Sequence, residues 1–159
     1  MITTRLIHPI ILGTLAQAGH GSTVLITDGH YPAPTAVGAN ATTVHLNLEA
    51  GVPPVPAVLS LILESIPVEK VTLIQPPPDA HPSQVQDEID EVLAGQVTTE
   101  LVDRFAFYDI ARSPDLALCI VTGDVRRFAN VLLTIGVLGS TAEWRRQTGS
   151  QNLSSETRT

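Results

Sequence analysis

Short apolar runs recur along the chain with two different spacings. After Pro9, which suits the first turn of a helix, apolar residues at helical spacing continue to Gly19, so this pattern predicts a helix over about 9–18. The next run, 23–27, is short, rich in β-branched residues and bounded by glycine and polar residues. Such a run is typical of a buried strand. Asp28 then falls at the carboxyl end of this strand.

The alternation of helical and strand patterns continues to residue 135. The same criteria predict two more helices, over 57–66 and 82–93. They predict five more strands, over 42–46, 68–74, 97–102, 117–121 and 131–135. Strands that alternate with helices indicate an α/β fold with three layers, α/β/α, in which helices cover both faces of a mostly parallel or mixed central sheet.

The composition changes from residue 139 onward. Ser, Thr, Gln, Asn and Arg dominate there, and Trp144 is the only large apolar side chain before Leu153. We therefore expect one domain over 1–138 and a polar C-terminal tail over 139–159. The tail is expected to be poorly ordered, with docking on a neighbouring subunit through Trp144 as the alternative.

Charge and hydropathy narrow the class of protein. Hydrophobic residues make up 43% of the chain and charged residues only 16%, a low charge content that predicts apolar surface covered by other subunits. The net charge of −7 and the scattered Lys and Arg residues argue against a nucleic-acid partner. The apolar runs fall short of the roughly 20 residues that cross a bilayer, so we expect no membrane partner. The single cysteine, Cys119, lies in an apolar run, which fits a buried thiol in a reducing cytoplasm.

The polar residues around the 23–27 strand are the candidate chemistry. His20 stands between two glycines before this strand, and Asp28 follows it. An imidazole with an ordinary pKa near 6.5 exchanges a proton at neutral pH, and a carboxylate accepts hydrogen bonds from two neighbouring hydroxyls. The pattern suggests an acid–base group beside an oriented acceptor. The alternatives are that His20 only fills a turn and that Asp28 is a solvated strand end.

Four blocks of sequence, in order, resemble the RbsD/FucU family of ribose pyranases and fucose mutarotases. They are GHG around His20, DGHYPA from Asp28, RFAFY from Arg104, and FAN at 128–130 before an apolar run. The resemblance covers roughly residues 5–138. It implies an isomerase of the racemase-and-epimerase type that interconverts anomers or ring forms of a ribose- or fucose-like aldose. It also implies a ring-based homo-oligomer, a decamer or pentamer, with the pocket at the subunit interface.

The resemblance also implies roles for particular residues. His20 corresponds to the proton donor, and opening the sugar ring needs only proton transfers, so we expect neither cofactor nor metal. Asp28, Arg104 and Asn130 correspond to residues that hold sugar oxygens. For Arg104 the alternative is a surface salt bridge, although we expect the aromatic residues of its block to pack tightly and fix its direction.

His30 and Phe128 carry further expectations. His30 lies in a matched block and either binds substrate or hydrogen-bonds the backbone to shape its loop. Phe128 is expected to form an apolar wall, but many relatives have tyrosine there. The missing hydroxyl costs about 0.5–1.5 kcal/mol of binding if water substitutes for it. The alternative function is therefore a non-catalytic monosaccharide-binding protein of a sugar uptake or catabolic system, and a third is a purely structural ring-forming protein.

Other chemistries fit the sequence poorly. The remaining histidines His8, His45 and His81 have no metal-ligand spacing. Gly19 and Gly21 precede a predicted strand, whereas a phosphate-binding loop precedes a helix. Ser22 has no nucleophile-elbow pattern around it.

Overall fold

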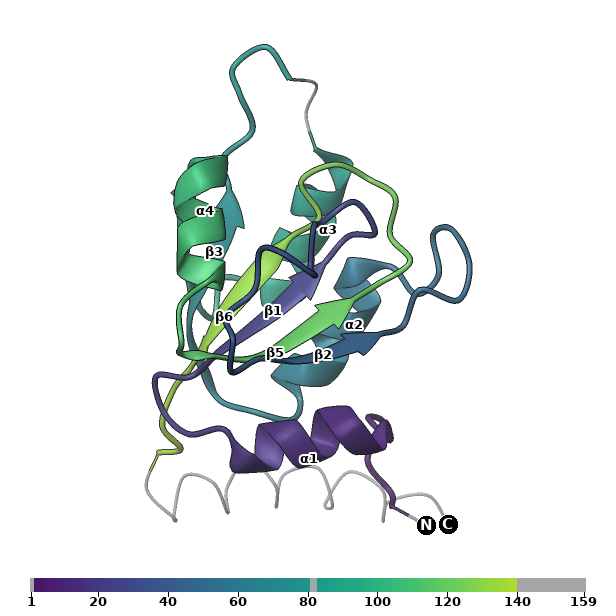
Figure 1. Cartoon of the computed structure of the whole chain (residues 1–159), viewed down its shortest axis with the longest axis vertical. Helices are drawn as coiled ribbons and strands as arrows, with labels where there is room; N and C mark the ends of the chain where they lie inside the picture. The colour runs from purple at the N-terminus through teal and green to yellow at the C-terminus, as the bar shows by residue number, and fades with distance from the viewer. Residues whose placement is uncertain (1, 81–82, 140–159) are drawn as a thin grey trace, which may run out of the picture.

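The computed structural model of the protein describes residues 2–80 and 83–139. It contains four helices and six strands within those residues (Figure 1). The elements in chain order are α1 (Pro9–Gln17), β1 (Thr23–Thr27), β2 (Thr42–His45), α2 (Val55–Leu63), β3 (Val68–Ile74), α3 (Gln84–Leu93), β4 (Thr98–Val102), α4 (Arg104–Ala111), β5 (Leu116–Val121) and β6 (Val131–Ile135).

The strands form one mixed sheet in the order β2-β5-β1-β6-β3-β4. Strands β2, β5 and β1 pair in parallel, as do β3 and β4, whereas β6 is antiparallel to both of its neighbours, β1 and β3. The carboxyl ends of five strands and the amino end of β6 therefore meet at one edge of the sheet, which we call the carboxyl edge. The opposite edge is called the amino edge. In α/β sheets, ligands commonly bind beyond the carboxyl ends of the strands.

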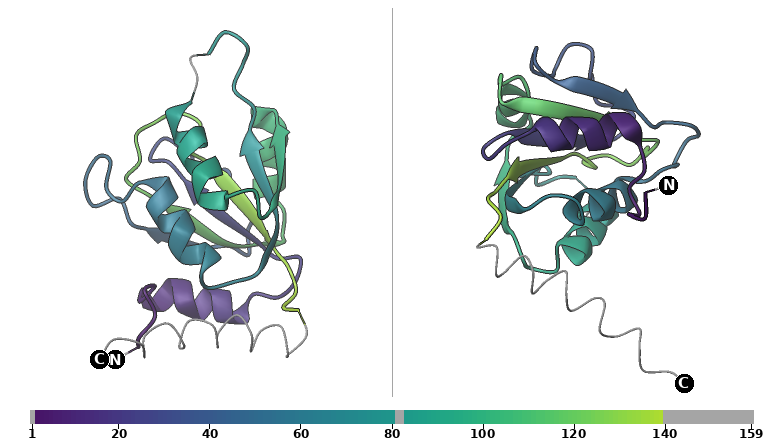
Figure 2. Two further views of the ribbon diagram at one scale, coloured as in Figure 1. Left: turned by 180° about the vertical axis from the view of Figure 1, so that it is seen from behind. Right: turned by 90° about the horizontal axis from the view of Figure 1, so that it is seen from below.

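Helices cover both faces of this sheet (Figures 1 and 2). On one face α2 and α3 pack on alternate strand residues, and α1, whose Ile11 and Leu15 are buried, lies across the lower end of the sheet in Figure 1. On the other face α4 and part of the segment 31–41 cover a second cluster around Phe107. Strand β1 lies between these two layers and all five of its residues are buried.

The predicted α/β fold with three layers and a mixed sheet is confirmed. Eight of the nine predicted elements have bounds close to the observed ones, while the helix predicted over 57–66 begins at Val55 and ends at Leu63. Helix α4 was not expected, because its sequence was interpreted only as an aromatic block. The expected tight packing of that block is wrong in part: Phe107 is fully buried, but Phe105 is 67% exposed.

Several smaller expectations concern single residues. Cys119 is buried in β5, and burial raises the pKa of its thiol to about 12. His8 caps α1, where its Nδ1 atom accepts from the Ile11 N–H. The described part of the chain includes no helix long and apolar enough to span a bilayer. The predicted tail and its Trp144 lie outside the described residues, apart from Gly139.

Candidate functional site

Asp28 and Asn130 meet at the carboxyl edge because their strands are antiparallel neighbours. Asp28 follows the last residue of β1, and Asn130 precedes the first residue of β6. The Asn130 Nδ2 atom donates to Asp28 Oδ2 at 2.9 Å, and Asn130 Oδ1 accepts from the Asp28 backbone N–H at 3.3 Å. These two contacts fix the amide relative to the carboxylate. The structure thus brings together two of the residues predicted to hold sugar oxygens.

The alternative interpretation of Asp28 as a solvated strand end is wrong, since only 3% of the residue is exposed. Burial raises the pKa of its carboxyl group above the ordinary value, because a charge loses hydration there. Hydrogen bonds from the His30 backbone N–H, at 2.9 Å, and from Asn130 partly offset this effect. A buried carboxylate with a few fixed donors is poised to accept hydrogen bonds from ligand hydroxyls.

His30 makes the backbone contact named as its alternative role. Its Nε2 atom lies 3.0 Å from the carbonyl oxygen of Val125, so the protonated Nε2 donates to the loop after β5. The ring is exposed, two residues beyond Asp28. His30 therefore joins the turn after β1 to the neighbouring loop.

Phe128 has an unusual backbone, with φ of 66°, in the left-handed region that few residues other than glycine occupy. Its half-buried side chain packs against the second core cluster, and the Arg127 guanidinium lies 5.3 Å from the ring centroid. Phe128 also lines a cleft of about 460 Å³ between the start of α3 and the residues before β6, together with Ser83, Arg126 and Arg127. This volume is in the usual range for small-molecule sites. Asp28 and Asn130 do not themselves line this cleft.

Arg104 lies at the same edge of the sheet, at the start of α4 just after β4. Its guanidinium lies 4.9 Å from the ring centroid of exposed Phe105. The salt bridge named as its alternative is not seen with any described residue. The structure does not place Arg104 in contact with Asp28.

His20 lies at the amino edge, so the expectation that it stands beside Asp28 is wrong for a single chain. The two residues lie beyond opposite ends of β1, whose five extended residues alone span about 16 Å. The His20 side chain is 58% exposed, and its Nε2 atom lies 3.1 Å from Glu69 Oε2. Gly21, whose φ is 82°, forms the turn that leads from His20 into β1.

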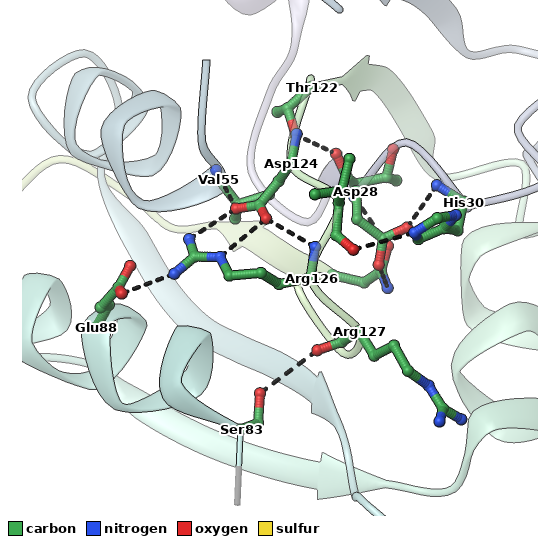
Figure 3. Close-up of polar contacts among 12 residues, drawn as sticks. Asp28, His30, Val55, Ser83, Glu88, Thr122, Asp124, Arg126 and Arg127 are labelled. Carbon is green, nitrogen blue, oxygen red and sulfur yellow. Dashed lines mark hydrogen bonds and ion pairs between the residues drawn. The ribbon is translucent and has the colours of Figure 1, made fainter. Parts of the chain in front are cut away.

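A buried ion pair next to the site was missed by the sequence analysis. Asp124 is 1% exposed and accepts hydrogen bonds from Arg126 at 3.0 and 2.8 Å (Figure 3). It also accepts from the Val55 backbone N–H, at the start of α2, at 3.1 Å. Burial alone would raise the pKa of Asp124, but these hydrogen bonds outweigh burial and lower it. One sequence feature could have identified Asp124: it follows the predicted 117–121 strand closely, as Asp28 follows the 23–27 strand.

The chemistry that Asp28 and Asn130 make available at the carboxyl edge is hydrogen bonding to a polar ligand. Asp28 supplies acceptors, and the amide of Asn130 supplies both a donor and an acceptor, as polyhydroxylated ligands require. Among residues 2–80 and 83–139, the structure contains no group of three or more His, Cys, Asp or Glu side chains placed to hold a metal ion. The fold and these residues define an α/β protein with a compact polar site at one sheet edge.

Comparison with known proteins places this chain in a family. Residues 1–138 match the RbsD / FucU transport protein family. D-ribose pyranase 2 of Streptomyces griseus is 30% identical over 128 residues, which cover 80% of this chain and 91% of that protein. The chain therefore belongs to the RbsD / FucU family.

Solved structures agree with this assignment. RbsD of Bacillus subtilis, in complex with D-ribose, has a TM-score of 0.74 and 22% identity over 87% of this chain and 100% of its own. The fucose mutarotase of Streptococcus pneumoniae, in complex with L-fucose, has a TM-score of 0.75 and 21% identity over the same shares. FucU of Bifidobacterium longum has a TM-score of 0.70 and is 27% identical, covering 84% of this chain and 96% of its own. The first two likenesses support the fold alone.

Proposed function

We propose that the protein is a mutarotase or pyranase that interconverts the anomers or ring forms of a ribose- or fucose-like aldose. The observation that carries this proposal is the buried Asp28 carboxylate, fixed by Asn130 and by the His30 backbone N–H at the carboxyl edge of the sheet. Such a pair can bind two neighbouring hydroxyls at once, and a monosaccharide presents such hydroxyls. The names of the relatives, a ribose pyranase and a fucose mutarotase, support the same substrate class.

His20 is the proposed general acid–base group, and a neighbouring copy of the chain supplies it. Ring opening transfers the proton of the anomeric hydroxyl to a base while the ring oxygen gains a proton, and reclosure reverses both transfers. One positioned imidazole contributes about 10²–10⁴-fold to such a reaction. His20 is exposed at the amino edge, so it is available to a second copy. We propose a ring-based homo-oligomer, a decamer or pentamer, in which each site joins the carboxyl edge of one copy to His20 of the next.

The remaining residues have supporting roles in this proposal. Phe128 forms an apolar wall against the C–H face of the sugar, and Arg104 donates to a sugar oxygen from the start of α4. His30 shapes the Asp28 turn through its contact with Val125 and reaches substrate with the other side of its ring. We also propose a cytoplasmic location, supported by the single, buried, unpaired Cys119, and a catalytic domain that comprises residues 1–138.

One observation favours a second candidate function. The side chain at 128 is phenylalanine, without the hydroxyl that tyrosine would offer to a sugar or to a proton transfer. A site that binds without turnover would serve as a monosaccharide-binding protein of an uptake or catabolic system.

Exchange NMR over a panel of aldoses separates these two functions. Ribose, fucose and related sugars are mixed with the protein, and magnetisation transfer between anomers is compared with the uncatalysed rate. The proposal predicts excess exchange for at least one sugar and its loss in the His20→Ala variant. Saturation transfer to a sugar without excess exchange for any aldose supports the binding protein. Neither binding nor exchange for the whole panel contradicts both.

A further inference from the structure

Arg126 directs its whole guanidinium group at two acidic side chains. Its Nε and one terminal nitrogen donate to the two carboxylate oxygens of Asp124, and the other terminal nitrogen donates to Glu88 Oε1 at 2.7 Å. In Figure 3 Arg126 points toward Asp124 and Glu88, whereas Arg127 extends in the opposite direction. Arg126 is thus engaged by the protein itself, although it borders the cleft.

Asp124, which is bound by Arg126, is hydrogen-bonded to the turn that carries Asp28. Its backbone carbonyl accepts from the Gly29 N–H at 2.8 Å, within the turn that carries Asp28. The next carbonyl along, that of Val125, accepts from the His30 ring. A displacement of Asp124 would therefore pass directly to the turn that presents the Asp28 carboxylate.

The same loop continues into the other half of the site. The Arg127 carbonyl accepts a hydrogen bond from Oγ of Ser83, the cap of α3, at 3.4 Å. The Phe128 carbonyl accepts from Nε2 of Gln86, within α3, at 3.5 Å. These contacts are long, so they hold the loop weakly. The bidentate Arg126–Asp124 pair lies within this loop, and it is tied to α3 through Glu88 at 2.7 Å and to α2 through the Val55 N–H at 3.1 Å, before the loop reaches Phe128 and Asn130.

Stability alone explains this arrangement poorly. Removing a carboxylate from water costs free energy, and the attraction within its ion pair often does no more than offset that cost. Hydrophobic residues of similar volume commonly stabilise the fold at least as well. An ion pair of this kind is more readily understood as a device that fixes geometry. We propose that Arg126 is a positioning residue that acts through Asp124 to hold the Asp28 turn and the Phe128–Asn130 segment in the arrangement that binds sugar. The inference rests on the proposed function.

The test compares Arg126→Met, which removes the guanidinium, with Arg126→Lys, which keeps the charge but loses the bidentate fork. Arg5→Met is the matched control, because Arg5 forms an exposed ion pair with Glu64 away from the carboxyl edge. For each variant, exchange NMR gives kcat and KM, and the side-chain amide signals of Asn130, identified by their absence in Asn130→Ser, report the geometry of the site. Thermal unfolding measures stability separately.

We expect Arg126→Met to lower kcat at least tenfold per folded subunit, because misplacement by about 1 Å costs up to roughly 100-fold. Its Asn130 amide signals should shift, Arg126→Lys should be intermediate, and Arg5→Met should match wild type. A lower Tm with unchanged kcat and unshifted Asn130 signals would overturn the inference. If wild type shows no exchange for any aldose, the proposed function fails, and the Asn130 signals alone decide the positioning role. If Arg126→Met does not fold, Arg126→Lys and Glu88→Gln supply the same readouts.

Discussion

Two inactive variants should restore each other's activity when they share an oligomer. His20 and Asp28 lie beyond opposite ends of β1, whose five extended residues alone span about 16 Å, so one chain cannot bring them to the same sugar. His20→Ala removes the acid–base group, and Asp28→Asn removes a buried carboxylate that binds hydroxyls. His20→Ala alone should lose about 10²–10⁴-fold in turnover, and Asp28→Asn alone should lose sugar binding and with it activity.

In a mixed oligomer, a working site needs an intact carboxyl edge from one copy and an intact His20 from its neighbour. With equal amounts and random assembly each condition holds at half of the positions, so about a quarter of the sites should be complete. The two variants are co-expressed with different affinity tags, and oligomers that carry both tags are isolated. Exchange NMR should then give close to a quarter of the wild-type rate per subunit.

The result that refutes this reasoning is equally clear. If each variant alone is inactive and doubly tagged oligomers are equally inactive, the two residues do not act in one site shared between copies, and the shared site is refuted. As a control for effects of the tags, each variant is also co-expressed with itself under the two tags, so that every subunit in the doubly tagged oligomer carries the same substitution. Light scattering of each preparation establishes that the variants assemble as wild type does.

Four further predictions follow from individual residues. Phe128→Tyr restores a hydroxyl and should raise sugar affinity or turnover roughly two- to tenfold, whereas identical kinetics would mean that this ring does not face the sugar. Because Asp124 has a lowered pKa in the folded protein, its stabilisation is complete above the unfolded value of about 3.8 and is lost as pH falls through the folded value. Urea unfolding should therefore show the stability gap between wild type and Asp124→Asn narrowing below that pH, and a gap that widens on acidification contradicts the assigned ion pair. Phe107→Ala, which empties a fully buried position, should lower the free energy of unfolding by about 3–5 kcal/mol, and a loss under 1 kcal/mol would argue against this core. Maleimide should label Cys119 far more slowly in the native protein than in urea, since burial raises its thiol pKa to about 12, and equal rates would show that the thiol is accessible.

The sequence was sufficient for most of the fold because hydrophobic spacing reports on it directly. The 23–27 and 131–135 runs consist of apolar and β-branched residues, and each matches a buried central strand, β1 or β6. Helix α4 was missed because apolar and aromatic residues fill both its buried and its exposed positions, so the eight-residue segment has no clear helical spacing and was interpreted only as an aromatic block. Its Asp103 cap, which accepts from two backbone N–H groups, was a local signal that could have identified it.

The candidate site was predictable only in part. The position of Asp28 at a strand end follows from local pattern, but its contact with Asn130 depends on β6 running antiparallel beside β1. The spacing of residues along the sequence does not indicate that these two strands pair. For the same reason His20 was expected beside Asp28, because closeness along the chain was interpreted as closeness in space. The Asp124–Arg126 pair carries no motif, and its importance becomes visible only when α2 and α3 are placed around it.

A crystal structure of the oligomer with a bound aldose tests the central claim most directly. The account predicts a sugar within hydrogen-bond distance of Asp28 and Asn130 of one copy, with the imidazole of His20 from an adjacent copy near the anomeric or ring oxygen. A sugar bound elsewhere, or a His20 ring that faces only solvent and Glu69 in the assembled protein, would contradict it.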